Sequence, residues 1–226
     1  MPLSFWRSKA LKYMDKKLKR VGITGPKGFL GRHANWFFST KKEEIEIVSI
    51  TITSIQDSEE LIKLLSGLDV LVHLARIHPL DVSNPEDVYS GNIDLAKKLL
   101  LGLDETKSKP YIIFGSSTQI NKDNPYGRAK KEIGKMFRDW GEKNESNVAN
   151  LIIPNEFGES ATPGRISVVS TFCEDLVTGK ESKVSDTATV FLVHAQDVVK
   201  KIYELILEPK NEDVLLQGVE MSVLDL

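Results

Sequence analysis

The sequence predicts an α/β fold with a doubly wound, mostly parallel sheet. Short stretches rich in β-branched residues alternate along the chain with longer stretches of helical periodicity. One near-continuous apolar stretch, 69–75 (DVLVHLA), is typical of a parallel strand that is covered on both faces. The length of 226 residues suits one such domain with a small appendage.

The order of the elements follows from these patterns. We expect strands at 21–24, 46–53, 69–75, 111–114, 150–153 and 189–193. We expect helices at 28–40, 58–66, about 84–103, 126–140 and 195–207, with Ser58 as the cap of the second. Ligands of parallel sheets bind beyond the carboxyl ends of the strands, so functional residues are expected in the loops that follow them.

Composition excludes several classes of protein. The net charge of −2 gives no basic field for nucleic acid. The single cysteine, Cys173, precludes a disulfide within the chain, and we expect it to be a buried thiol in a cytoplasmic protein. No apolar run is long enough to cross a membrane, and the N-terminus lacks the apolar core of a signal peptide. Four histidines without metal-ligand spacing predict no metal site.

The first twenty residues differ from the rest in charge. They contain seven lysines and arginines but one acid, Asp15. Two interpretations stay open, a solvated basic extension or an amphipathic helix that lies on an anionic membrane or a partner. We therefore divide the chain into an extension, 1–20, and a dinucleotide-binding domain, 21–226, with substrate-side segments at about 154–188 and 208–226.

A glycine-rich stretch, 24–31 (TGPKGFLG), separates the first expected strand from the first helix. Gly25 permits a tight turn, Gly28 permits close approach of a pyrophosphate, and Gly31 permits close packing of helix on strand. The helix N-terminus would face the phosphates with free N–H groups. Alone, this pattern also fits an ordinary strand–helix turn, but its place in the chain favours a Rossmann-type dinucleotide site.

The second strand is expected to carry the residue that reads the adenosine ribose. Residues 48–56 (VSITITSIQ) contain neither the acid typical of NAD binding nor an arginine typical of NADP binding. Lys27, inside the glycine loop, could meet a 2′-phosphate, so we favour NADP(H) over NAD(H).

Tyr126 and Lys130 are four residues apart at the start of an expected helix, so their side chains share a face. A nearby ammonium stabilises a phenolate and lowers the pKa of the phenol, which would allow Tyr126 to exchange a proton with a substrate oxygen. Ser117, just past the fourth strand, could hydrogen-bond the same oxygen. Such pairs also occur by chance on exposed helices; the glycine loop and the serine in the same order favour the catalytic interpretation.

These motifs, with His73-Leu74-Ala75, Gly115-Ser116-Ser117 and Pro154-Asn155-Glu156-Phe157-Gly158, resemble those of the extended short-chain dehydrogenases/reductases, the NAD-dependent epimerase/dehydratase family. More narrowly, the chain resembles the reductase half of capsular-polysaccharide enzymes that reduce a 4-keto-6-deoxy amino sugar linked to a nucleotide diphosphate. The similar stretches are SGNIDLAKKLL, SSTQINKDNPYGRAK, PNEFG and SVVSTFCEDL.

The resemblance implies a role for each matched residue. Tyr126 would be the acid, Lys130 would bind the nicotinamide ribose, and Ser117 would polarise the carbonyl. The remaining residues implied in cofactor binding are Gly25, Lys27, Gly28, Phe29, Leu30, Gly31, Leu74, Ala75, Pro154 and Asn155. The expected partners are a nucleotide-diphosphate sugar and a second copy of the chain. Leu95, Leu99, Ile133 and Phe137 are candidate dimer contacts, and the alternative is that they face the sheet.

The sequence departs from this family pattern on the substrate side. Ile152 stands where an arginine often precedes Pro-Asn, 164–167 (GRIS) replaces a polar Asn-Tyr-Asn-Ser stretch, and 194–197 reads HAQD. The similar bifunctional enzymes continue into a metal-binding cupin domain that has no counterpart in this sequence. An epimerase and a non-catalytic dinucleotide-binding module therefore remain as alternatives; a dehydratase is disfavoured because Thr118-Gln119 stands where an acidic pair is usual.

Overall fold

The computed structural model describes residues 18–182, 184 and 188–226. Most of the basic extension, and any amphipathic helix within it, lies outside these residues. The main sheet has six parallel strands in the order β2-β1-β3-β4-β5-β8. Their bounds are β1 Lys19–Thr24, β2 Ile45–Ile50, β3 Val70–His73, β4 Tyr111–Ser117, β5 Val148–Ile153 and β8 Asp213–Leu215. The predicted doubly wound parallel sheet is confirmed.

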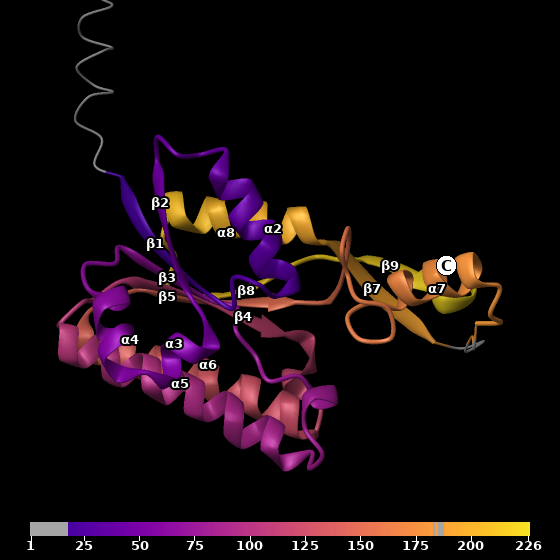
Figure 1. The fold of residues 1–226 in the computed structure, drawn as a ribbon, viewed down its shortest axis with the longest axis horizontal. Helices are drawn as coiled ribbons and strands as arrows, with labels where there is room; N and C mark the ends of the chain where they lie inside the picture. The colour runs from indigo at the N-terminus through magenta and orange to yellow at the C-terminus, as the bar shows by residue number, and fades with distance from the viewer. Residues whose placement is uncertain (1–17, 183, 185–187) are drawn as a thin grey trace, which may run out of the picture.

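Helices cover both faces of this sheet (Figure 1). On one face lie α2 Phe29–Ser39 and α8 Ala195–Leu207, and on the other lie α3 Ile52–Gln56, α4 Ser58–Leu65, α5 Glu86–Thr106 and α6 Pro125–Asn144. The strands alternate between the two cores: Val70 and Val72 of β3 pack under α2 and α8, whereas Leu71 packs under α4 to α6. Both faces are apolar because both are covered.

A second, smaller sheet lies beside the main one in Figure 1. Its order is β6-β7-β9, from β6 Asn155–Phe157, β7 Thr189–His194 and β9 Val219–Ser222. Helix α7, Val168–Thr178, lies with it. The strand expected at 189–193 is thus present, but it belongs to this sheet. Short 3-10 turns, η1 Pro79–Asp81, η2 Thr118–Asn121 and η3 Val223–Asp225, complete the described elements.

Several local expectations were wrong for identifiable reasons. The second strand ends at Ile50, because the Thr51 hydroxyl accepts the Ser54 amide at 3.0 Å and begins α3. The cap of α4 is Asp57 and not Ser58, since its carboxylate accepts the amides of Glu59 and Glu60. Cys173 is exposed on α7, not buried.

Of the two interpretations of the candidate dimer contacts, the structure supports the one in which they face the sheet. Leu95, Leu99, Ile133 and Phe137 are fully enclosed between α5, α6 and the sheet, so they are core residues. The outward side of α6 is instead charged, with Arg128, Lys131, Glu132, Lys135 and Arg138 among its exposed residues. No helix in the described ranges is both long and apolar enough to span a membrane.

Candidate active site

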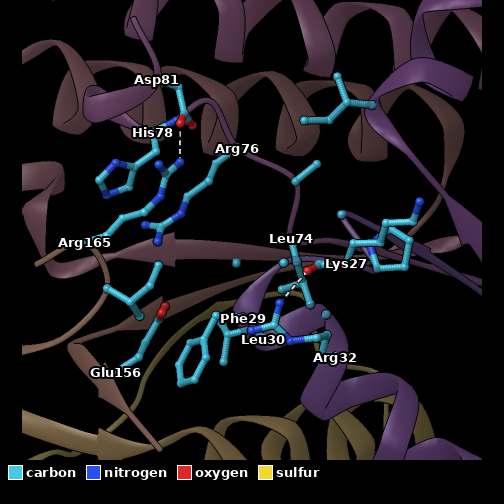
Figure 2. Close-up of a pocket in the computed structure, with 18 of the residues that line it drawn as sticks. Lys27, Phe29, Leu30, Arg32, Leu74, Arg76, His78, Asp81, Glu156 and Arg165 are labelled. Carbon is cyan, nitrogen blue, oxygen red and sulfur yellow. Dashed lines mark hydrogen bonds and ion pairs between the residues drawn. The ribbon is translucent and has the colours of Figure 1, made fainter. Parts of the chain in front are cut away.

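A cavity of about 520 Å³ opens at the carboxyl ends of the central strands. The strand order reverses between β1 and β3, so the loops after these two strands diverge there and leave a crevice. The loop β1–α2, the residues after β3, the end of β4, the start of α6 and β6 all contribute to its wall. Figure 2 shows Arg76, His78, Asp81 and Arg165 gathered at one end, and Lys27 and Arg32 toward the other.

The glycine loop has the close packing that its sequence predicts. Gly25 has a φ of +67°, a left-handed conformation that glycine adopts without strain. A Cβ on Gly31 would lie 2.1 Å from the Gly25 carbonyl oxygen, so only glycine fits there. Gly28 begins α2 without a side-chain cap, and the first turn contains no acid. The α2 N-terminus therefore presents uncapped amides and a positive dipole to the cavity, an arrangement that fits a pyrophosphate.

Hydroxyl groups, and no charged group, follow β2 at the place expected to read the adenosine ribose. Thr51, Ile52 and Thr53 line the cavity there. Lys27 is exposed on the loop, and Arg32 donates to the Lys27 carbonyl at 2.9 Å and to the Ser160 carbonyl at 2.8 Å. Arg32 also lines the cavity, and sequence reasoning missed it because helical residues carry no sign of which loop they reach.

A buried hydrogen-bond cluster fixes the backbone at the end of β3. The Thr24 hydroxyl accepts the amides of Leu74 at 3.0 Å and Ala75 at 2.9 Å. Its proton is then directed to Nδ1 of His73, 2.8 Å away, which requires a neutral imidazole. Burial, with a smaller contribution from the positive charge of Lys130, lowers the pKa of His73 to about 3. His73 is therefore a satisfied core histidine that holds Leu74 and Ala75 against the cavity.

The start of α6 positions Tyr126 and Lys130. The Asn124 carboxamide accepts the Gly127 amide at 2.7 Å, and a Cβ on Gly127 would lie 2.2 Å from the Gln119 carbonyl oxygen, so the first turn packs tightly on η2. Tyr126 is 9% exposed and Lys130 is 4% exposed, and both line the cavity. The Lys130 ammonium donates to the Gly115 carbonyl at 2.5 Å.

The pKa values in this part of the cavity are governed by burial. Burial, assisted by the charge of Arg76, lowers the pKa of Lys130 to about 7. Burial raises the pKa of Tyr126, and Arg76 is the cation that opposes this. Burial also raises the pKa of Glu156, against the charges of Arg76 and Lys130. The expectation that Lys130 lowers the pKa of Tyr126 is thus not met in this structure, because the ammonium is directed at Gly115.

The structure brings most of the predicted site residues together. Those that line the cavity are Gly25, Lys27, Gly28, Phe29, Leu30, Gly31, Leu74, Ala75, Tyr126 and Lys130. Ser117 does not: its hydroxyl accepts the Gln119 amide at 3.3 Å, and Ser116 lines the cavity instead. Pro154 and Asn155 lie between the lining residues Ile153 and Glu156, and Asn155 donates to the Phe191 carbonyl at 3.3 Å.

Charged residues that the motifs did not single out as a group occupy the other end of the cavity. Arg165 forms an ion pair with Asp81, whose carboxylate also accepts the His78 amide at 3.1 Å. Glu156 reaches the cavity from β6, opposite the loop that carries Arg76. In the sequence, Arg76 and His78 could be recognised as site residues by their position after a buried strand. Glu156 could be recognised by its place in the PNEFG motif. Within the described ranges no cluster of histidine, cysteine and carboxylate side chains could hold a metal.

The fold and the cavity define a Rossmann-type dinucleotide-binding protein. Residues 21–216 match the model of the NAD dependent epimerase/dehydratase family, and the chain belongs to that family.

Two known proteins resemble the chain over most of its length. UDP-2-acetamido-2,6-beta-L-arabino-hexul-4-ose reductase of Pseudomonas aeruginosa is 28% identical over 200 residues, which are 88% of this chain and 52% of the reductase. The crystal structure of capsular polysaccharide assembling protein CapF from Staphylococcus aureus has a TM-score of 0.74 and 26% identity, covering 90% of this chain and 54% of CapF. The chain thus spans about half the length of these two relatives.

A third likeness concerns the fold alone. UDP-glucose 4-epimerase from Thermotoga maritima, solved with UDP-glucose, has a TM-score of 0.80 and 20% identity, covering 91% of this chain and 79% of the epimerase.

Proposed function

We propose that this chain catalyses the NAD(P)H-dependent reduction of a nucleotide-linked 4-keto-6-deoxy (amino) sugar, in the cytoplasmic synthesis of surface-polysaccharide precursors. The observation that carries the proposal is the convergence of the glycine loop, Tyr126 and Lys130 on one cavity. The similarity to a UDP-sugar keto-reductase supports the substrate class. The cavity also carries cationic side chains at both ends, Lys27 and Arg32 toward one and Arg76 and Arg165 at the other, which suits the phosphates of a dinucleotide and of a nucleotide sugar bound together.

Each residue would have a distinct task. The α2 N-terminus would hold the pyrophosphate of the cofactor, which supplies the hydride. Leu74 and Ala75 would line the dinucleotide, and Lys130 would bind the nicotinamide ribose. Tyr126 would give its phenolic proton to the substrate oxygen as the carbonyl carbon accepts the hydride, leaving a phenolate that regains a proton from water. Pro154 and Asn155 keep their proposed places near the nicotinamide, and Ser117 or its cavity-lining neighbour Ser116 would polarise the carbonyl.

We expect the cofactor to be NADP(H) in preference to NAD(H). The cavity wall after β2 holds hydroxyls and no carboxylate that would repel a 2′-phosphate. Lys27 and Arg32 are the cations of the adjoining loop and helix, and both line the cavity. Isothermal titration calorimetry with NADPH and with NADH measures the two affinities and so the cofactor preference.

The proposed reaction is tested by a screen of nucleotide-linked 4-keto sugars with the preferred cofactor. Loss of NADPH absorbance with formation of a nucleotide-linked hydroxy sugar supports a reductase. Isomer formation without net oxidation would identify the alternative, an epimerase. Tight dinucleotide binding without turnover of any screened sugar would overturn the reaction and leave a binding module.

We also expect a homodimer, as the pairing of α5 with α6 suggested. The contacts would be made by the outward faces of these helices, which carry charged residues and the exposed Leu101 of α5, since Leu95, Leu99, Ile133 and Phe137 are internal. Light scattering at micromolar concentration tests this expectation, and a monomer would contradict it.

A further inference from the structure

Arg76 is the polar partner of the Tyr126 hydroxyl. Its Nη1 atom lies 3.4 Å from the phenolic oxygen, and its guanidinium carbon lies 5.9 Å from the centre of the Tyr126 ring. Arg76 comes from the loop after β3 and Tyr126 from the first turn of α6, so the contact joins two walls of the cavity. A guanidinium cannot be deprotonated in a protein, so it is a donor in every state of the reaction.

Lys130 does not make this contact. Its Nζ atom donates to the Gly115 carbonyl at 2.5 Å and lies 4.6 Å from the centre of the Phe114 ring. The same atom is 5.6 Å from the centre of the Tyr126 ring, and its hydrogen bond is made to Gly115. The sequence assigned the stabilisation of a phenolate to Lys130, but the cation that donates a hydrogen bond to the Tyr126 hydroxyl is Arg76.

The loop that carries Arg76 is held in place. The carboxamide of Asn92, which is buried in α5, accepts the Ile77 amide at 3.0 Å and donates to the Ile77 carbonyl at 3.0 Å. The same group donates to the Val88 carbonyl at 2.6 Å, which ties it to its own helix. Because both backbone groups of Ile77 are bonded, the neighbouring Arg76 starts from a fixed backbone position.

Within the part of the chain that the structure describes, the charge of Arg76 is not neutralised by a carboxylate in contact with it. Among the described residues, no carboxylate forms an ion pair with it, because Asp81 is paired with Arg165. Glu156 of β6 acts on Arg76 through the field across the cavity, and so does Asp81. A half-buried guanidinium without a close counter-ion has a stronger effect on a neighbouring phenolate than one neutralised by contact.

We propose that Arg76 is a catalytic residue of the reaction proposed above, and the inference rests on that function. When Tyr126 gives its proton to the substrate oxygen, the negative charge develops on the atom to which Arg76 donates a hydrogen bond. The carbonyl carbon gains the hydride of the reduced dinucleotide, the carbonyl oxygen gains the phenolic proton, and Arg76 stabilises the phenolate that remains. No proton leaves Arg76 in this step.

The charged groups that face Tyr126 agree with this role. Burial raises the pKa of the phenol, Arg76 lowers it through its charge and its hydrogen bond, and Glu156 raises it. Lys130, on the same helix, also lines the cavity, with its Nζ atom 5.6 Å from the centre of the Tyr126 ring. Removal of Arg76 should therefore raise the pKa of Tyr126 and weaken it as an acid.

The test measures the ionisation of Tyr126 without turnover. A polyfluorinated tyrosine is placed at position 126, because ring fluorines lower the pKa of the phenol into a range in which proteins stay folded. Its ring absorbance is titrated in the parent, in Arg76→Met, in Arg76→Lys and in Arg138→Met. Arg138→Met is the matched control. Arg138 is on α6, the same helix as Tyr126, but it pairs with Asp213 on the surface. Circular dichroism and dinucleotide affinity verify that each variant is folded.

We expect Arg76→Met to raise the pKa of the phenol by about one unit or more, a tenfold change in its ionisation constant. Arg76→Lys should restore part of the shift, and Arg138→Met should match the parent. An unchanged phenol pKa in Arg76→Met overturns the proposal, even if turnover falls, since Arg76 would then act on the substrate alone. If the phenol shifts but the parent reduces no keto sugar, the proposed reaction fails and the proposed catalytic role fails with it.

Turnover provides the second readout. In the reductive direction, activity falls with rising pH as Tyr126 loses its proton. Arg76→Met should lower the plateau of kcat and move this alkaline limb to higher pH. A purely structural role for Arg76 would lower activity at every pH without moving the limb, and that result would contradict the proposal.

Discussion

Lys130 makes the stability of the fold depend on pH. Its buried ammonium has a pKa of about 7 in the folded chain, against an ordinary value of 10.5. Between these values the unfolded chain holds a proton that the folded chain has released, so the free energy of unfolding rises with pH. One proton corresponds to a slope of about 1.4 kcal/mol per pH unit. Over the whole interval the charged lysine destabilises the fold by at most about 5 kcal/mol.

The substitution Lys130→Met removes the charge and keeps most of the side-chain length. It also removes the hydrogen bond to the Gly115 carbonyl, which is worth about 1.5–3 kcal/mol for a charged donor. Near neutral pH and below, the variant should therefore be more stable than the parent by at most about 2–3.5 kcal/mol. The difference should shrink as pH rises and reverse in sign near pH 10, where the parent lysine is neutral and still bonded.

The assay is urea unfolding, followed by circular dichroism, in steps from about pH 6 to about pH 10. Lys131→Met is the matched control, because Lys131 is exposed on the same helix and its loss should leave the pH dependence unchanged. A difference between Lys130→Met and the parent that stays constant over this range would show that the charge of Lys130 does not determine the pH dependence of stability.

Three further predictions concern the glycine loop. Gly28→Val should abolish dinucleotide binding by calorimetry, because the side chain would occupy the space of the pyrophosphate. Far-ultraviolet circular dichroism should be retained, because the Cβ would lie 3.2 Å from the Gly25 carbonyl oxygen, a contact that needs a shift of a few tenths of an ångström; undiminished affinity would count against this loop as the phosphate site. Gly31→Ala should destabilise the fold by at least about 1–3 kcal/mol, because its Cβ would lie 2.1 Å from the same oxygen; an unaltered thermal midpoint would disprove that packing. Lys27→Ala should weaken NADPH binding much more than NADH binding, and equal losses would remove Lys27 from 2′-phosphate recognition.

The sheet and its loops could be predicted because their signals are local. In the stretch 69–75, Val70 and Val72 face one core and Leu71 faces the other, so this strand is apolar on both faces. The glycine loop follows β1 directly in the sequence. Where a single hydroxyl decided the structure, the prediction was wrong: Thr51 looks like a strand residue by composition but caps α3. The small sheet was predicted only in part, since β6 and β9 have three and four residues and little periodicity.

The site was predictable as a set of motifs but not as a set of contacts. Neighbouring positions in β4 differ in which side they face, so Ser116 lines the cavity while Ser117 does not. The contact between Arg76 and Tyr126 joins residues 50 positions apart, and no spacing rule connects them. The spacing of Tyr126 and Lys130 correctly placed both side chains in the cavity, yet it could not show that the ammonium is bonded to Gly115.

The proposed reduction of a keto sugar requires the Tyr126 hydroxyl as its proton donor. The most direct measurement compares the turnover of a nucleotide-linked 4-keto sugar by the parent and by Tyr126→Phe, with NADPH affinity measured on the same samples. The variant keeps the buried ring, so affinity should stay nearly unchanged while turnover falls by roughly a hundredfold to ten-thousandfold. Equal turnover by the two proteins would contradict the assignment of the Tyr126 hydroxyl as the proton donor.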